Sequence, residues 1–169
     1  MNKTVRLRSN IKVEISSFER VLGIVSFVML VMLWLYLFTN WSSVPDKIPT
    51  HFGFSGILDA WGGKSSIIFL PIVMTVLYLM MTTLAAFPQY YNYAVAITPE
   101  NAAAQYKNAR TLMLWVTLQL VAVFSYITLM MMQVGLGNAK SFGLWFLPIF
   151  LVVIFGTLIY YIRKINKLK

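Results

Sequence analysis

The chain has 169 residues, of which 59% are hydrophobic and only 11% are charged, and its mean hydropathy is +0.74. A water-soluble domain carries about 25% charged residues, so this composition excludes a soluble globular protein and indicates an integral membrane protein. The formal net charge is +9. The chain has no cysteine, which excludes disulfides, thiolate metal sites and cysteine nucleophiles.

Hydrophobic stretches without a charged residue recur along the chain, each close to the ~20 residues that cross a bilayer. They lie at about residues 21–38, 67–87, 112–132 and 144–162. None shows the alternating pattern of barrel strands, so we predict an all-α membrane protein with four transmembrane helices. The transmembrane domain would cover residues 21–162, between a basic N-terminal segment (1–20) and a basic C-terminal tail (163–169).

The basic residues are distributed unevenly between the two sides of the predicted membrane domain. Of 14 lysines and arginines, only Lys47, Lys64 and Lys140 fall in the links after the first and third stretches. The positive-inside rule therefore predicts that both termini are cytoplasmic. The basic segments would determine this topology and contact anionic lipid, and we expect no nucleic-acid partner.

Capping signals predict where two of the helices begin. Ser17 is predicted to cap the first helix, with Glu19 in its first turn. A second start, Thr98–Pro99–Glu100, predicts a single helix from about residue 99 to residue 132, roughly 50 Å long. The outer link at residues 133–143 has the composition of a plain turn.

The loop at residues 40–66 is the most specialised part of the chain. It contains the only histidine, both aspartates, two prolines and four of the nine glycines. Ordering such a loop costs conformational entropy, so we predict one ordered extracytoplasmic loop between helices 1 and 2, with residues 48–52 extended.

The side chains of this loop have two interpretations. In the first, His51, Asp59 and Lys64 contact a ligand above an aromatic floor. The floor would consist of Phe52, Phe54 and Trp61. In the second, the loop is a purely structural cap with its aromatic rings in the membrane interface. In either case Asp59 and Lys64 could form an ion pair.

Catalysis is not indicated. Asp46, His51 and Asp59 are the only candidate metal ligands, but their spacing matches no metal motif. We therefore assign no catalytic residue, metal or cofactor, and a metal-dependent membrane hydrolase using these three residues is a minor alternative. Gln119 is the deepest strongly polar side chain of the spans, and we interpret it as an interhelical hydrogen-bond partner. A small transporter, or an accessory subunit of a transport complex, is the main alternative.

The run P-x-x-I-P-x-H-F-x-x-x-G-x-x-D-x-W-x-x-K, from Pro45 to Lys64, together with Ile97–Asn101, Gln105, Tyr106 and Arg110, resembles a known pattern. It is similar to a bacterial membrane domain of unknown function that also occurs in the SdpI family of toxin-immunity and signalling proteins. The resemblance implies a role in ligand binding or loop structure for the matching positions. These are Pro45, Pro49, His51, Phe52, Gly53, Gly56, Asp59, Trp61 and Lys64.

We therefore expect a non-enzymatic protein of the immunity or sensor type in the bacterial cytoplasmic membrane. Its outer loop would recognise a peptide toxin or another membrane-associated ligand. A cytoplasmic regulator or membrane partner would contact Tyr90, Tyr91, Tyr106, Lys107 and Arg110. A bundle of four helices is thin, and a homodimer is compatible with it.

Overall fold

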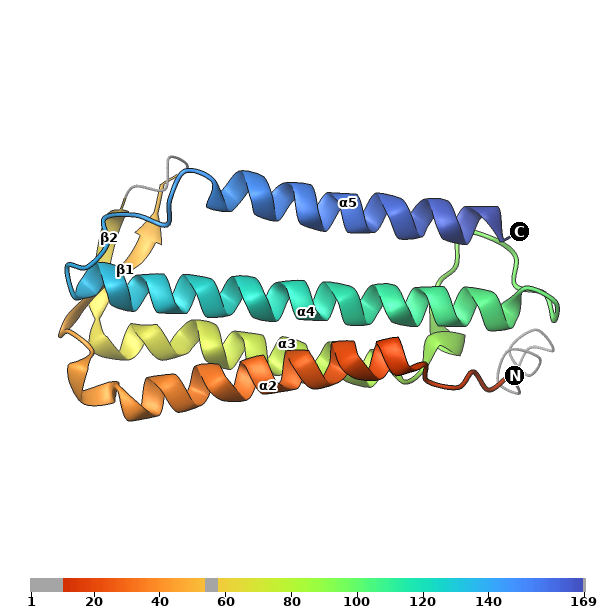
Figure 1. The fold of residues 1–169 in the computed structure, drawn as a ribbon, viewed down its shortest axis with the longest axis horizontal. Helices are drawn as coiled ribbons and strands as arrows, with labels where there is room; N and C mark the ends of the chain where they lie inside the picture. Colours follow the sequence, from red (N-terminus) through yellow and green to blue (C-terminus); the bar gives the residue numbers. More distant parts are fainter. Residues whose placement is uncertain (1–10, 54–57, 169) are drawn as a thin grey trace.

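The computed structural model describes residues 11–53 and 58–168. Within them, four helices are long and apolar enough to cross a membrane, and they lie side by side along one axis (Figure 1). The elements in chain order are α2 (Ser17–Thr39), η1 (Trp41–Ser43), β1 (Lys47–Phe52), β2 (Leu58–Gly63), η2 (Lys64–Ile68), α3 (Phe69–Ala85), η3 (Pro88–Tyr90), α4 (Ala102–Gly135) and α5 (Phe146–Lys167).

The N-cap of helix α2 lies one residue earlier than predicted. Ser16, not Ser17, is the N-cap: its Oγ accepts from the Glu19 backbone N–H (3.3 Å), and its own N–H donates to Glu19 Oε2 (2.8 Å). This reciprocal capping box requires an acid three residues after the cap, which fixes the choice between the two adjacent serines.

The link between α2 and α3 departs from the all-α prediction. Strands β1 and β2 form an antiparallel hairpin, the only sheet in the described part of the chain. Residues 48–52 are extended as predicted, but the partner strand Leu58–Gly63 was not predicted. Figure 1 shows this hairpin at the same end of the bundle as the link between α4 and α5.

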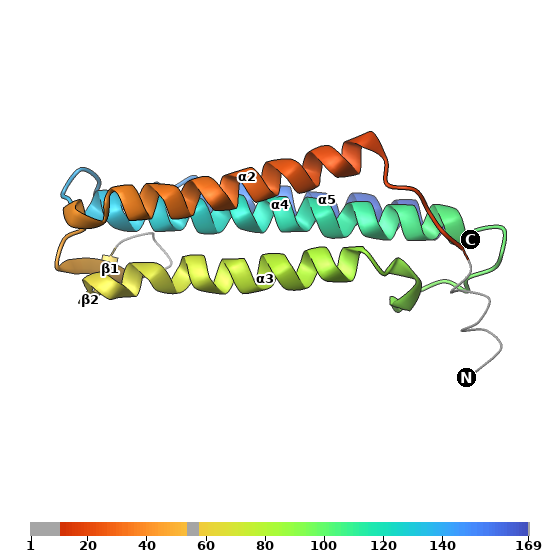
Figure 2. The same cartoon turned by 90° about the horizontal axis from the view of Figure 1, so that it is seen from below.

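Helix α4 is the central element and contacts each of the other three long helices. Figure 1 shows α5 on one side of α4 and both α2 and α3 on the other, and Figure 2, turned by 90°, shows α2 and α3 flanking α4 with α5 behind it. The predicted long helix exists, with 34 residues and a length of about 50 Å. It begins at Ala102 instead of residue 99. A turn precedes it, in which the Thr98 N–H donates to Asn101 Oδ1 (2.9 Å) and the Ala102 N–H donates to the Thr98 carbonyl (3.0 Å).

Two apolar clusters hold the bundle together. One lies between α2, α3 and α4 and contains Leu30, Met74 and Val121. The other lies under the hairpin and contains Leu37, Val44, Ile48, Ile67, Met131 and Met132. Most other apolar side chains of the helices face outward, as expected for surfaces that contact lipid instead of water.

Candidate functional site

The hairpin is fixed to the ends of the helices through its apolar residues. Ile48 of β1 is fully buried, as is Ile67 of the adjoining η2, and both pack with Leu37 of α2 and with Met131 and Met132 of α4. Pro49 is also fully buried. An isolated two-stranded hairpin is marginally stable, so this packing is what makes a rigid platform of it.

Two compensating bulges shape the hairpin. Pairing shifts between Pro49 and His51 on β1, where Thr50 is the extra residue, and between Leu58 and Ala60 on β2, where Asp59 is the extra residue. Bulges redirect side chains at sheet edges and are frequent beside functional sites. Here the two irregularities lie next to each other, at the position where His51 meets Asp59.

His51 and Asp59 form an exposed pair. The His51 Nδ1 atom lies 2.5 Å from Asp59 Oδ1, and the two side chains are 68% and 49% exposed. A polar contact this accessible to water contributes ~1 kcal/mol or less to stability. The geometry therefore orients two polar groups toward the surroundings without contributing much to the fold.

In the described structure Asp59 pairs with His51, and the ion pair that Asp59 and Lys64 could have formed is absent. The Lys64 ammonium instead lies 5.1 Å from the centre of the Trp41 ring, and the Lys64 backbone N–H donates to the Asp46 carbonyl (2.9 Å). Lys64 thus closes the base of the hairpin, while Asp59 is directed to the other end of the strands.

Gly62 permits a close approach at the same base. A Cβ atom at this position would lie 2.5 Å from Thr50 Cγ2 and 2.9 Å from Ser66 Oγ. A side chain at this position would therefore force the Thr50 and Ser66 side chains to shift. The neighbouring Gly63 has open space instead, so only the first glycine of the pair is required by packing.

A groove of about 820 Å³ runs along the outside of the hairpin base. Trp61, 54% exposed, forms one wall. The groove is lined by Pro45, Asp46, Lys47, Trp61, Gly62, Gly63 and Gly135. It combines one large aromatic ring, one side chain of each charge and backbone made accessible by glycines, a set suited to a polypeptide segment or a polar headgroup. Gly135 of α4 belongs to this site and was not predicted, because its role depends on the contact of α4 with Pro45.

The remaining predicted loop residues divide into three groups. Phe52 ends β1 opposite Leu58, and Gly53 follows it. Gly56 and Phe54 lie outside the described residues. Asp46 does not join His51 and Asp59: the described part of the chain has no group of three potential metal ligands.

The opposite end of the bundle contains a buried charge network that the sequence did not suggest. Arg110 donates from Nε to Glu19 Oε1 (2.9 Å) and from Nη2 to Glu19 Oε2 (3.0 Å), with side chains 7% and 0% exposed. Thr111 Oγ1 also donates to Glu19 Oε1 (3.0 Å). Arg110 further donates to the carbonyls of Val13 (2.9 Å) and Glu14 (2.6 Å). The network therefore joins α2, α4 and the segment preceding α2.

This finding corrects part of the predicted partner surface. Arg110 and Tyr106 are buried inside the chain, whereas Tyr90 and Lys107 are exposed. Tyr91 donates its hydroxyl hydrogen to the Leu84 carbonyl (2.8 Å) and stacks on Tyr93. Burial raises the pKa of Tyr91 to about 12, although the nearby positive charge of Arg110 opposes this. Of the five predicted contact residues, Tyr90 and Lys107 are therefore exposed and Tyr91 is half-buried.

Gln119 lies where α4 faces α5. Its Nε2 donates to Thr157 Oγ1 (2.7 Å), while its buried Oε1 has no hydrogen-bond partner in the described structure. An apolar cavity of about 570 Å³ adjoins it, lined among others by Tyr126, Trp145 and Phe146. Gln119 thus makes the interhelical bond expected from the sequence and keeps one free acceptor.

Residues 28–75 match a family model described as "Domain of unknown function (DUF1648)". The matched region begins in α2, includes the hairpin and ends in α3. A stretch of 75 residues is 29% identical to an uncharacterized protein of Archaeoglobus fulgidus and covers 40% of this chain. The chain spans about two fifths (41%) of the length of that curated relative. No solved structure matches the chain. The chain therefore combines four membrane-length helices with a match to an uncharacterised family, and the matched region includes the hairpin.

Proposed function

We propose that the protein is a multi-pass membrane protein of the immunity or sensor type, whose hairpin recognises a peptide or another membrane-associated ligand outside the cell. One observation carries the proposal: the hairpin is anchored through buried Ile48 and Pro49, yet it exposes His51, Asp59 and Trp61. These three exposed side chains add little to the stability of the fold, yet they stand on a rigid support. The resemblance of the loop motif to SdpI-type immunity proteins agrees with this role.

The proposal places the hairpin on the extracytoplasmic side and both termini in the cytoplasm. The uneven distribution of lysine and arginine supports this orientation. Because the chain has no cysteine, a single introduced cysteine can show on which side of the membrane its position lies. Ser65→Cys, in η2, should react with a membrane-impermeant maleimide in intact cells, and Asn92→Cys, in the link before α4, should react only after permeabilisation. The reverse pattern would reject the proposed function.

Recognition of a toxic peptide by the hairpin can be tested by measuring the survival of cells that express the protein. Cells that express the wild-type chain should survive exposure to membrane-active peptides secreted by the source organism better than cells without it. His51→Ala, Asp59→Ala and Trp61→Ala should each abolish this protection at unchanged membrane abundance. Trp145→Ala is the matched control, since Trp145 is also strongly exposed but lies outside the hairpin. Full protection by all three hairpin variants would contradict the proposal.

A role in transport is the second candidate, favoured by the free acceptor of Gln119 beside the cavity between α4 and α5. Polar groups within a membrane often mark a substrate path. Purified protein in liposomes should then move a solute, and Gln119→Leu should stop this movement. Movement unaffected by Gln119→Leu would remove Gln119 from the path.

A further inference from the structure

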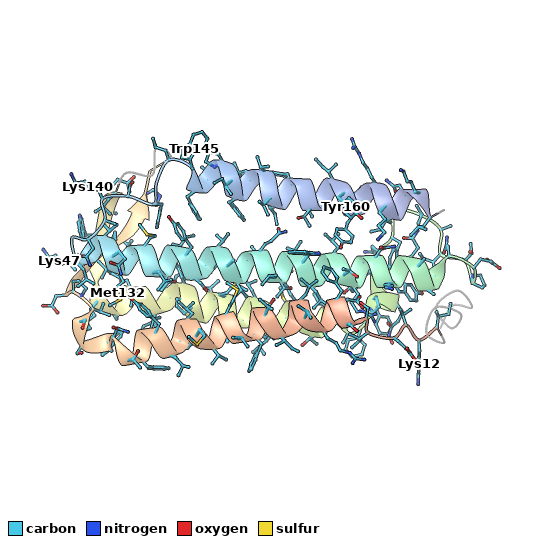
Figure 3. All side chains as sticks on the ribbon, viewed as in Figure 1. Lys12, Lys47, Met132, Lys140, Trp145 and Tyr160 are labelled. Carbon is cyan, nitrogen blue, oxygen red and sulfur yellow. The ribbon has the colours of Figure 1, made fainter. Side chains whose placement is uncertain are left out.

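The last three turns of α5 have an exposed face on which apolar and basic side chains adjoin. A groove of about 520 Å³ follows this face, lined by Gly156, Ile159, Tyr160, Arg163, Lys164 and Lys167. These positions recur every three to four residues and therefore lie along one side of the helix. In Figure 3 the labelled Tyr160 lies along α5, toward the end of the bundle where Lys12 also lies.

The groove is positively charged at one end. Arg163, Lys164 and Lys167 are all exposed, and α5 contains no acidic residue. A helix C-terminus carries partial negative charge, which would repel an anion, but Lys164 and Lys167 in the last turn offset it. In addition, Gln105 Nε2 of α4 donates to the Ile165 and Leu168 carbonyls (both 2.9 Å), so part of this negative end is already bound. The exposed surface at the end of α5 therefore carries a net positive charge.

Two tyrosines hold one of these cations in place. The Lys164 ammonium lies 6.0 Å from the centre of the Tyr160 ring and 5.8 Å from that of Tyr161. A lysine positioned over aromatic rings has fewer accessible conformations than a freely rotating one. The site thus has one cation restricted by aromatic rings, with the exposed Arg163 and Lys167 beside it.

The other end of the groove is an apolar notch. Gly156 has no side chain, and a Cβ atom at its position would meet nothing within 4 Å. It lies eight residues before Lys164, or about 12 Å along the helix axis. Positive charge at a helix end, with an apolar notch about 12 Å deeper in the bilayer, matches an amphiphile with an anionic head and a hydrocarbon chain.

We propose that this face of α5 binds one anionic phospholipid. Its phosphate lies among Arg163, Lys164 and Lys167, and an acyl chain fills the notch over Gly156 and Ile159. The orientation favoured by the charge distribution places the site in the cytoplasmic leaflet, where anionic lipids attract basic side chains. A soluble acidic protein or a nucleic acid has no segment that could enter the bilayer as far as Gly156. The inference is independent of the hairpin and of its ligand.

The test is binding of phosphatidylglycerol to the purified full chain in detergent, followed by native mass spectrometry, with phosphatidylcholine as the uncharged comparison. The variant Arg163→Gln/Lys164→Gln/Lys167→Gln should bind phosphatidylglycerol about a hundredfold more weakly, since each basic side chain near an anionic lipid contributes roughly fivefold. Gly156→Leu fills the notch without changing the charge and should also weaken phosphatidylglycerol binding.

A matched control separates a formed site from diffuse attraction. Lys12→Gln/Arg20→Gln/Lys107→Gln removes three exposed positive charges from the same end of the bundle, away from the groove. It should leave the affinity within about twofold of wild type, because none of the three side chains lines the groove and salt weakens the attraction of exposed charges outside it. Equal losses in both triple variants would overturn the proposal, as would unchanged binding by Gly156→Leu. Inorganic phosphate that competes as strongly as the lipid would show an anion site without lipid recognition and would also overturn it.

Discussion

Within residues 11–53 and 58–168, each end of the bundle holds one acid–base pair, and the two pairs differ in almost every physical respect. At one end Glu19 and Arg110 are buried, bidentate and joined to Thr111 and to two backbone carbonyls. At the other end His51 and Asp59 meet through one contact and remain largely exposed. Buried charges without complete partners are costly, whereas exposed ones contribute little to stability.

The difference teaches which end is structural and which is available for recognition. The polar atoms of the Glu19–Arg110 network bond to other groups of the same chain. The network connects α2 to α4 through two residues that are 91 positions apart in the sequence. The hairpin pair leaves polar atoms free for another molecule. The proposed recognition role depends on this contrast, and substitutions at each end can break it.

The largest effect is expected from Glu19→Ala. This substitution leaves Arg110 buried without a counter-charge, so the free energy of unfolding should fall by about 3–5 kcal/mol. Denaturant titration in detergent micelles measures this change. Glu14→Ala is the control, because Glu14 is exposed and contributes only its backbone carbonyl to the network.

A double variant distinguishes a required network from a replaceable one. Glu19→Leu/Arg110→Met removes both charges and should cost less than Glu19→Ala alone, because no unpaired charge remains buried. A loss below about 1 kcal/mol in Glu19→Ala would mean that this pair behaves like an exposed one, which would remove the contrast between the two ends.

A smaller effect is expected at the base of the hairpin. Gly62→Ala should lower the free energy of unfolding by about 1–3 kcal/mol, because the new methyl group collides with Thr50 and Ser66. Gly63→Ala, one residue on, meets open space and should change it by less than about 0.5 kcal/mol. Equal effects of the two substitutions would contradict the close packing that makes the hairpin rigid.

The sequence predicted the four long helices well, because stretches of about 20 apolar residues have few structural alternatives. It failed on β2. The segment Leu58–Gly63 contains Asp59 and two glycines, residues that are depleted in strands. Its extended form depends on pairing with β1, and β1 in turn depends on burial of Ile48 against α2 and α4.

The candidate site was predictable only in its local part. The loop motif singled out His51, Asp59 and Trp61, but their pairing required the two bulges, which no spacing rule specifies. The Glu19–Arg110 contact spans most of the chain and has no local signal. The capping box did have one: the pattern Ser16-x-x-Glu19 could have selected Ser16 over Ser17.

The smallest expected effect is also the one that most sharpens the comparison between the two ends. A double-mutant cycle with His51→Ala, Asp59→Ala and the combined variant should give a coupling free energy of about 0.2–1 kcal/mol, because water surrounds both side chains. The same denaturant titration measures it.

A coupling of 3 kcal/mol or more would equal that of a buried pair. His51 and Asp59 would then be needed to hold the hairpin together, and loss of protection in their alanine variants could no longer be attributed to a lost ligand contact. A small coupling together with lost protection assigns these side chains to recognition, because the fold would be intact while the function was gone.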